Sequence, residues 1–339
     1  MGSTGELLQK LQEGRGDEAL RGLYALDGSD ASLEKGRERA VRVVRAFEAE
    51  FGARPEAALF SGPGRTEIGG NHTDHQHGRV LCGSVDLDML ACAAPNGTDL
   101  VRIQSEGYPA LEVDLRDLKV REEEKNSSPA LVRGVAARLA ELGCRPAGFD
   151  AYVTSTVLSG SGLSSSAAYE ILVATIIDCF FGGGTLDPVE RAKVGQYAEN
   201  VYFGKPCGLM DQMGSSVGGA VAIDFADPAA PVVKKVEYDF TRSGHALCIV
   251  DTGSCHADLT DDYADITREM GAVAAHFGKK FLRDVDEGAF RAALPQLRQE
   301  CGDRAVLRTM HFFEEDCRAE QEAQALEQRL KDEALDVTI

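Results

Sequence analysis

The feature that most constrains the fold is a glycine- and serine-rich stretch at residues 159–168, which separates two regular elements. Residues 149–157 before it are rich in β-branched and aromatic side chains and predict a strand. After it, apolar residues recur at helical spacing and predict a buried helix. Convergent N–H groups of the glycines, with the positive end of the helix dipole, would suit a phosphate group. A serine-capped turn explains this stretch equally well by itself.

Composition restricts the classes of partner. The 339 residues suffice for about two domains. With 36 basic and 55 acidic residues the net charge is −19, which disfavours nucleic acid and anionic membrane surfaces. We find neither an apolar signal core at the amino end nor a stretch of membrane-spanning length. Nine cysteines without a C-x-x-C pair favour thiols in a reducing compartment, so we expect a cytoplasmic location.

Helix and strand patterns are mixed along the chain. Helical spacing covers much of residues 5–52, and a buried strand is predicted at 57–60. Further strands are predicted within 79–104 and at 220–225, 232–236 and 246–251; further helices at 131–139, from 187, and from 262 onward. A change of pattern near residue 205 predicts two domains, 1–205 and 206–339.

A second polar stretch, residues 64–77, follows the strand predicted at 57–60 and is expected to be a loop. One interpretation is a metal site made from His72, Asp74, His75 and His77, although such close spacing crowds the ligands onto one turn. Another is a sugar site, because sugar hydroxyls need fixed carboxylate, amide and imidazole groups. A plain polar loop is the third interpretation, and the local pattern leaves all three open.

The third polar stretch is residues 205–213. Its Asp211 lies between the apolar Met210 and Met213, where a carboxylate is costly unless it has a partner. A cation such as Arg65 could be that partner. Upstream, Glu199 lies on a predicted helix, and its pattern alone favours a surface glutamate.

Together the three stretches resemble those of galactokinases, which are GHMP small-molecule kinases. The family's second motif, Gly-Leu-Ser-Ser-Ser-Ala, is intact at 162–167, and its Pro-Cys-Gly-Ile-Met-Asp-Gln stretch is nearly intact at 206–212. Its first motif, Gly-Arg-Val-Asn-Leu-Ile-Gly-Glu-His-Thr-Asp-Tyr, is matched at Gly64, Arg65, Gly70, His72, Thr73 and Asp74. The resemblance covers residues 30 to 320 approximately. It implies an α/β (α+β) fold, the two-lobed GHMP kinase fold with mixed sheets and helices and an active site between the lobes.

The resemblance also implies roles. The reaction would be ATP- and Mg2+-dependent phosphorylation of the C1 hydroxyl of galactose, with Asp211 as the base and Arg65 neutralising Asp211 and the transferred phosphoryl group. The implied sugar-binding residues are Asn71, His72, Asp74, Gly208 and Tyr263. The residues implied to hold the ATP phosphates are Gly160, Ser161, Gly162, Leu163, Ser164, Ser165 and Ser166, and those implied to hold Mg2+ are Ser166 and Glu199. We expect a monomer.

Two departures from the family pattern stand out. The glutamate of the first motif is Asn71 here, and its closing tyrosine is His75. No glycine-rich third motif follows Gly302, so we expect domain 206–339 to be truncated relative to the family. Alternative functions are a kinase for another sugar, such as N-acetylgalactosamine or arabinose, a non-catalytic sugar sensor, or a metal-dependent hydrolase built on His72–His77.

Overall fold

The structure, a computed structural model, describes residues 1–157, 160–238, 240, 247–250 and 260–331, except the side chains of 260–263 and 329–331. Its helices are α1 (Thr4–Gln12), α2 (Asp17–Tyr24), α3 (Asp30–Phe51), α4 (Ser128–Glu141), α5 (Ser165–Ile177), α6 (Pro188–Tyr197), α7 (Met210–Val217), α8 (Thr260–His276), α9 (Glu287–Ala292), α10 (Leu294–Glu300) and α11 (Asp303–Lys331). Its strands are β1 (Ala58–Gly69), β2 (Arg79–Pro95), β3 (Leu100–Ser105), β4 (Leu111–Asp114), β5 (Phe149–Ser155), β6 (Ala220–Asp224) and β7 (Val232–Val236).

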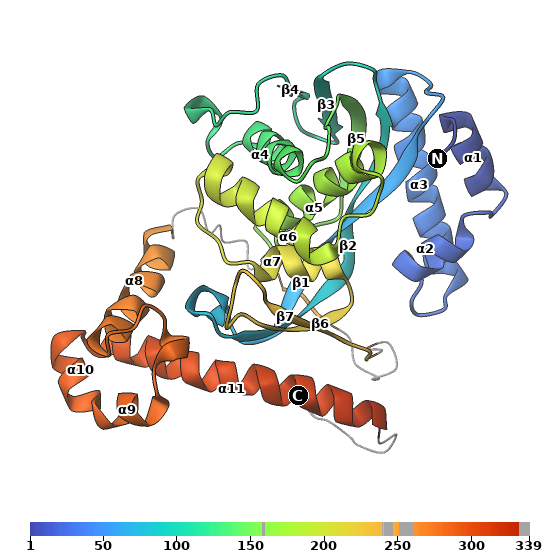
Figure 1. Cartoon of the computed structure of the whole chain (residues 1–339). Helices are drawn as coiled ribbons and strands as arrows, with labels where there is room; N and C mark the ends of the chain where they lie inside the picture. The colour runs from blue at the N-terminus through green and yellow to red at the C-terminus, as the bar shows by residue number, and fades with distance from the viewer. Residues whose placement is uncertain (158–159, 239, 241–246, 251–259, 332–339) are drawn as a thin grey trace.

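One mixed sheet organises the described part of the chain, with the order β4-β3-β5-β2-β6-β7 and with β1 paired to β2. The long strand β2 is its centre: residues 89–95 pair with β5, and residues 79–83 pair with β6. Only the β3–β5 pair among these strands is parallel. Figure 1 shows β1 and β2 running down the middle of the molecule, below α5 and α6.

Helices cover both faces of the sheet, so β2 is apolar on both sides. Ala91 and Ala93 belong to the core with α4 and α5. The alternate residues Leu90, Cys92 and Ala94 belong to the core with α1, α2 and α3. Because successive side chains of a strand point to opposite faces, this segment shows no alternation of polar and apolar residues.

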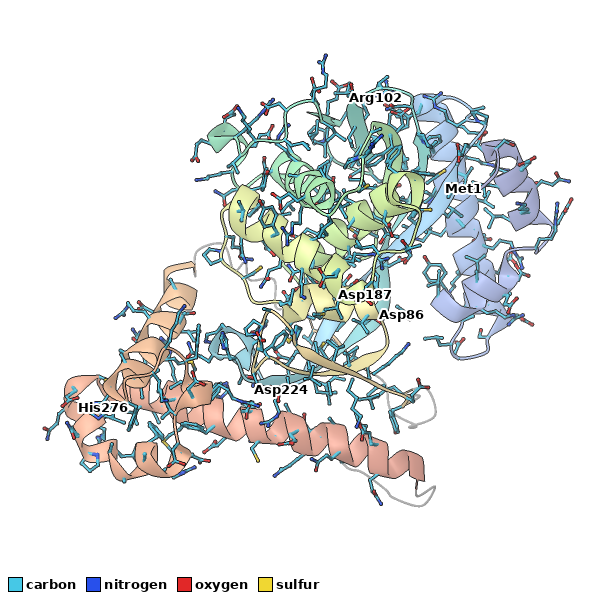
Figure 2. All side chains as sticks on the ribbon, viewed as in Figure 1. Met1, Asp86, Arg102, Asp187, Asp224 and His276 are labelled. Atoms are coloured by element: carbon cyan, nitrogen blue, oxygen red, sulfur yellow. The ribbon has the colours of Figure 1, made fainter. Side chains whose placement is uncertain are left out.

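The last four helices form a third apolar cluster around Phe290 and Phe312. Helix α11 then runs below β6 and β7 in Figure 1, and its Ala323 and Leu326 pack against β2, β6 and β7. Asp316 of α11 accepts a hydrogen bond from the backbone N–H of Arg79 at 2.6 Å and pairs with its guanidinium at 2.7 Å. Arg283 pairs with Asp316 and with Asp224, whose position at the end of β6 is labelled in Figure 2. Ion pairs thus fasten the C-terminal helices to β2 and β6.

Most predicted elements are present. Strand 149–155 is β5, the helix after the serine loop is α5, and the Asp187-Pro188 start is the beginning of α6, capped by Asp187. The prediction of a loop for 64–69 was wrong: β1 continues to Gly69 because these residues pair with 81–84 of β2. Residues 247–250, within the strand predicted at 246–251, are not in a strand, and residues 246 and 251 lie outside the described ranges.

Segments on both sides of residue 205 contribute strands to the same sheet: β1 to β5 come before it, and β6 and β7 come after it. The division into 1–205 and 206–339 therefore stays a prediction.

The expectation that no stretch reaches membrane-spanning length was wrong: the segment Ser165–Gly182 is long and apolar enough by length and composition, but 61% of it is buried inside the fold. Helix α5, which makes up most of it, packs between β1, α4 and α6. It is the central core helix of this fold.

Candidate active site

The site begins where β1 passes under the serine loop, by which we mean residues 160–164 before α5. The backbone N–H of Arg65 donates to the carbonyl of Leu163 at 3.1 Å. Earlier in the strand, a Cβ at Gly62 would stand only 2.4 Å from the carbonyl oxygen of Ala168. A glycine at this position lets the first turn of α5 lie directly on the backbone of β1.

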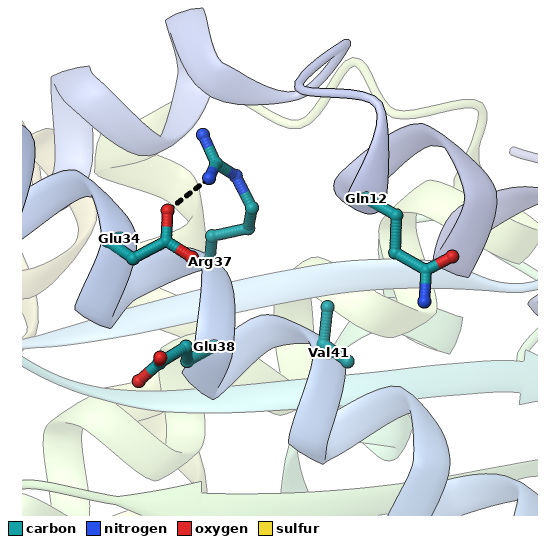
Figure 3. Close-up of a pocket in the computed structure, with 5 residues that line it drawn as sticks. All are labelled: Gln12, Glu34, Arg37, Glu38 and Val41. Atoms are coloured by element: carbon teal, nitrogen blue, oxygen red, sulfur yellow. Dashed lines mark hydrogen bonds and ion pairs between the residues drawn. The ribbon is translucent and has the colours of Figure 1, made fainter.

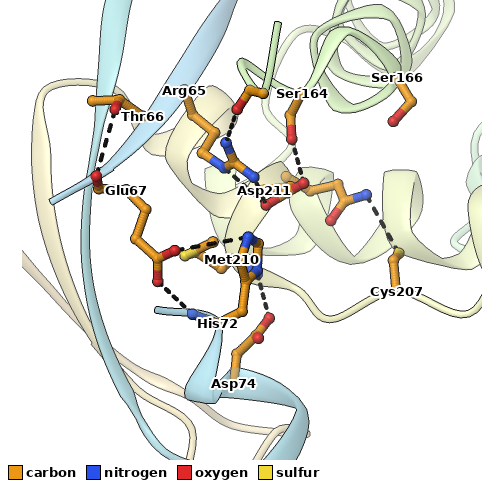
Figure 4. A network of polar contacts seen from close by, with 12 residues as sticks. Arg65, Thr66, Glu67, His72, Asp74, Ser164, Ser166, Cys207, Met210 and Asp211 are labelled. Carbon is orange, nitrogen blue, oxygen red and sulfur yellow. Dashed lines mark hydrogen bonds and ion pairs between the residues drawn. The ribbon is translucent and has the colours of Figure 1, made fainter. Parts of the chain in front are cut away.

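Arg65 and Asp211 form the centre of the site, as Figure 4 shows. Arg65 is buried, at 5% exposure, and its Nε and Nη2 lie 2.8 and 2.5 Å from Oδ1 of Asp211. Its Nη1 donates to the carbonyl of Gly162 at 2.7 Å. The hydroxyl of Ser164 donates to Oδ2 of Asp211. One guanidinium therefore ties the start of α7 to the serine loop.

Burial by itself raises the pKa of Asp211, but the charge of Arg65, with smaller contributions from His72 and the Ser164 hydroxyl, outweighs it and leaves the pKa below its usual value. Asp211 is therefore anionic at neutral pH. About a quarter of its side chain, 27%, stays exposed, so a ligand can reach it.

The serine loop adopts the backbone expected of an anion cradle. Gly160 and Gly162 have φ of 77° and 78°, and Ser164, which precedes α5, has φ of 54°. The Ser164 side chain makes no capping hydrogen bond to α5, because it is directed to Asp211. The amide groups at the start of α5 thus lack a side-chain cap, as a phosphate site requires.

A buried carboxylate network lies beside the loop. Ser166 donates its hydroxyl to Oε1 of Glu199 at 3.2 Å. Gln212 then donates from Nε2 to Oε2 of Glu199 and to Oε2 of Glu170, both at 3.0 Å. Glu170 and Gln212 are fully buried, and Glu199 is 3% exposed. Burial, and then the charge of Glu199, raise the pKa of Glu170 well above its usual value.

On the other side of Asp211, Asp74 lies in the 3-10 turn η1 (Thr73–Gln76). Its carboxylate accepts the backbone N–H of Met210 at 3.2 Å and that of His75 at 2.9 Å. A Cβ at residue 208 would stand 1.8 Å from Oδ2 of Asp74, so only glycine fits there. The motif of 206–212 and that of 64–75 are thereby held in direct contact.

His72 lies beside Asp74 and Glu67 (Figure 4) and has a left-handed backbone conformation, with φ of 59°. Its backbone N–H donates to Oε1 of Glu67 at 2.7 Å, and its Nε2 lies 3.7 Å from Oε2 of the same carboxylate. Sequence reasoning missed Glu67. Glu67 comes two residues after Arg65, and side chains two residues apart on a strand project to the same face. A strand prediction for this segment would therefore have placed Glu67 beside Arg65.

Two family models match this sequence. Residues 45–95 match the galactokinase galactose-binding signature, and residues 130–219 match the GHMP kinases N terminal domain. The galactokinase of Streptomyces coelicolor is 33% identical over 281 residues, which cover 83% of this chain and 72% of that protein. The Homo sapiens galactokinase is 32% identical over 290 residues, covering 83% and 71%. The chain belongs to the galactokinase family.

Solved structures show the shared fold. The crystal structure of Lactococcus lactis galactokinase complexed with galactose has a TM-score of 0.67 at 23% identity, covering 83% of this chain and 73% of that one. Methanococcus jannaschii mevalonate kinase has a TM-score of 0.50 at 17% identity, covering 66% and 73%. The predicted GHMP kinase fold and the predicted membership of the galactokinase family are confirmed.

Two further residues were expected in the site, Asn71 and Tyr263. Asn71 is exposed, with φ of 45°, and its side chain has no hydrogen bond to any residue that the structure describes. Tyr263 lies in α8, but its side chain falls outside the described residues, so its role stays a prediction.

The histidines of the first motif do not form a metal centre. The ring of His75 contacts the carbonyl of His72 and, at 3.3 Å, the sulfur of Met270. The ring of His77 stacks on Phe281 with centroids 3.6 Å apart. Across the described ranges, no three or more His, Cys, Asp or Glu side chains are grouped to hold a metal ion.

A separate surface pocket lies between α1 and α3 (Figure 3). The side chains that line it are Gln12, Glu34, Arg37, Glu38 and Val41, and none of them is a predicted site residue. Arg37 pairs there with Glu34 and, at 2.7 Å, with Asp17. The pair with Asp17 links α3 to α2, and the pair with Glu34 lies within α3.

Proposed function

We propose that this chain transfers the γ-phosphoryl group of ATP to the C1 hydroxyl of galactose, giving galactose 1-phosphate and ADP. The observation that carries the proposal is the Arg65–Asp211 pair, which joins the serine loop to the pocket of Asp74 and Gly208. A loop suited to phosphate and a pocket suited to sugar hydroxyls thus meet at one carboxylate. Membership of the galactokinase family supports the same substrate pair.

Phosphoryl transfer needs in-line positioning and neutralised charge more than covalent help from the protein. The C1 oxygen would attack the γ-phosphorus while the bond from that phosphorus to the ADP oxygen breaks. The hydroxyl proton would pass to Asp211. Because Arg65 keeps the pKa of Asp211 low, Asp211 is a weak base that orients the hydroxyl and accepts its proton late.

Mg2+ fits the donors beside the loop. Ser166 and Glu199 offer a hydroxyl and a carboxylate oxygen 3.2 Å apart, and Mg2+ prefers such hard oxygen ligands. A magnesium ion usually takes only one or two carboxylates, with water and substrate phosphates as its other ligands. When bound here it would neutralise phosphate charge. Ser166 and Glu199 are therefore our proposed metal ligands, and residues 160–166 our proposed phosphate-binding loop.

For the sugar we propose His72, Asp74 and Gly208, with Asn71 and Tyr263 as further contacts implied by the family motifs. Asp74 supports this because its carboxylate is held at the pocket by two backbone N–H groups and can still accept hydroxyl protons.

The decisive test is an ADP-coupled assay with galactose, N-acetylgalactosamine and arabinose as acceptors. We expect galactose-dependent ADP release by the unchanged chain, and none with Asp211→Asn, which should still bind galactose in calorimetry. Absence of turnover with all sugars, despite galactose binding, would favour a sensor over a kinase. Full turnover by Asp211→Asn would remove Asp211 from the role of base.

We further propose a cytoplasmic monomer with the domains 1–205 and 206–339. Seven of the described cysteines are free thiols, as a reducing compartment would maintain them: Cys82, Cys92, Cys144, Cys179, Cys207, Cys301 and Cys317. Light scattering coupled to gel filtration tests the monomer, and limited proteolysis near residue 205 tests the domain division.

A further inference from the structure

Glu67 stands on the same strand face as Arg65. Between these two residues the pairing of β1 with β2 is regular: Arg65 faces Ser84 and Glu67 faces Cys82. Side chains two apart in a regular strand project to the same side. Figure 4 shows both side chains directed to the side where Asp211 and His72 lie. Glu67 therefore borders the pocket proposed for the sugar.

The carboxylate of Glu67 has unused acceptor capacity. Its side chain is only 14% exposed. Oε1 accepts the N–H of His72 at 2.7 Å, but the 3.7 Å from Oε2 to the imidazole is too long for a hydrogen bond. Burial raises the pKa of Glu67, and the neighbouring His72 opposes that effect. Oε2 therefore retains an acceptor position that a hydroxyl donor of a ligand could fill.

The charges around this pocket define the chemistry of that ligand. Glu67, Asp74 and Asp211 border it, and the guanidinium of Arg65 is already paired with Asp211. Such a pocket repels anions and favours a neutral molecule rich in hydroxyl donors. A sugar that has not yet been phosphorylated meets this description.

Position 71 cannot contribute a carboxylate, because it holds an amide and faces solvent. We propose that Glu67 is a specificity-determining residue that accepts a hydroxyl of the bound sugar, supplying from β1 the carboxylate that residue 71 lacks. This inference rests on the proposed sugar kinase function.

The test compares Glu67→Gln, Asn71→Glu and the double variant in the full chain. Glutamine keeps the size of residue 67 and an oxygen for the N–H of His72. Galactose binding is measured by calorimetry without nucleotide, and the KM for ATP by the coupled assay. We expect about tenfold or greater loss of galactose affinity in Glu67→Gln, since a hydrogen bond to a charged group is removed. We expect the KM for ATP to change less than twofold, and Asn71→Glu to restore little of the loss, because residue 71 faces solvent.

Galactose analogues that lack one hydroxyl each separate a direct contact from a change in the pocket's shape. With a direct contact, the penalty of Glu67→Gln vanishes for one deoxy sugar and persists for the others. An equal penalty for every analogue, or no penalty for galactose, would overturn the inference. These outcomes leave the proposed function standing if the unchanged chain phosphorylates galactose; failure of that reaction would refute the function itself.

Discussion

Glu170 gives the sharpest stability prediction, because it is a fully buried acid that no cation contacts among the described side chains. Its Oε2 accepts from Gln212 at 3.0 Å, and its Oε1 has no hydrogen-bond partner there. Burial raises its pKa well above 4.5. Replacing it by glutamine keeps the shape of the side chain and removes the titrating group.

The direction in which the free energy of unfolding changes with pH follows from proton binding to Glu170. Below pH 4.5 both the folded and the unfolded chain hold this proton, and its contribution to stability is complete. As the pH rises, the unfolded chain releases the proton while the folded chain keeps it, so the free energy of unfolding falls until the pH passes the raised folded pKa. Relative to Glu170→Gln, the unchanged chain should lose stability as the pH rises above 4.5, by at most about 1.4 kcal/mol per pH unit.

The free energies of unfolding can be measured by urea denaturation followed by far-UV circular dichroism, since the chain has no tryptophan to report by fluorescence. With about 0.7 kcal/mol per kelvin of unfolding entropy for a chain of this length, a loss of about 1.4 kcal/mol moves the melting temperature by roughly 2 °C. Glu13→Gln is the matched control: hydrogen bonds from Gln9 and Arg15 lower the pKa of that exposed glutamate, so its effect has the opposite sign. A difference between the unchanged chain and Glu170→Gln that is independent of pH would show that Glu170 is ionised in the fold, and would refute the reasoning.

Three further substitutions address the site. Arg65→Lys should lower kcat about 100-fold or more in the coupled assay, because one ammonium cannot replace the paired contacts to Asp211 and the contact to the serine loop; a change below threefold would contradict this. Gly208→Ala should weaken galactose binding about tenfold or more by calorimetry, since its Cβ overlaps Asp74; unchanged affinity would argue against the pocket. Ser166→Ala should raise the Mg2+ concentration for half-maximal activity severalfold, and an unshifted magnesium titration would exclude Ser166 as a ligand.

Matched controls exist for the first two. Arg116 pairs with Asp114 at the surface, and its side chain is 75% exposed. Arg116→Lys should therefore leave kcat unchanged. Gly271→Ala lies in α8, where an added Cβ meets nothing within 4 Å, and should leave galactose affinity unchanged.

Local sequence patterns were enough to predict the part of the site whose residues are neighbours in sequence. The strand, the glycine-serine loop and α5 follow one another directly, so composition and periodicity suffice to predict them. The partnership of Arg65 and Asp211, 146 residues apart, was also predictable, because a carboxylate between two methionines needs a cation and Arg65 lies in another polar motif.

Other features depend on packing between distant elements. The length of β1 is set by its pairing with β2, so residues 64–69 had the composition of a loop and the backbone of a strand. Because a loop was predicted there, the sequence did not indicate that the side chains of Arg65 and Glu67 lie on the same face of a strand. Glu170 did leave a signal: α5 is apolar all round, so an acid within it must be buried. Its partner Gln212 comes from a different helix, and only the fold brings them together.

The charges of the site explain why the proton on Glu170 matters to a kinase. The acidic side chains around the Arg65–Asp211 pair are Glu67, Asp74, Glu170, Glu199 and Asp211. Positive charge close to these acids comes from buried Arg65 and from the largely exposed Lys205, whose Nζ lies 3.7 Å from Glu199. If all five acids were ionised, the anionic phosphates of ATP would meet a strongly negative field. A neutral Glu170 leaves Glu199 as the single negative charge beside Ser166, which the proposed magnesium ion could balance. In the proposed reaction, phosphate binding would then fall to that cation, to residues 160–164 of the loop and to the amide groups that begin α5.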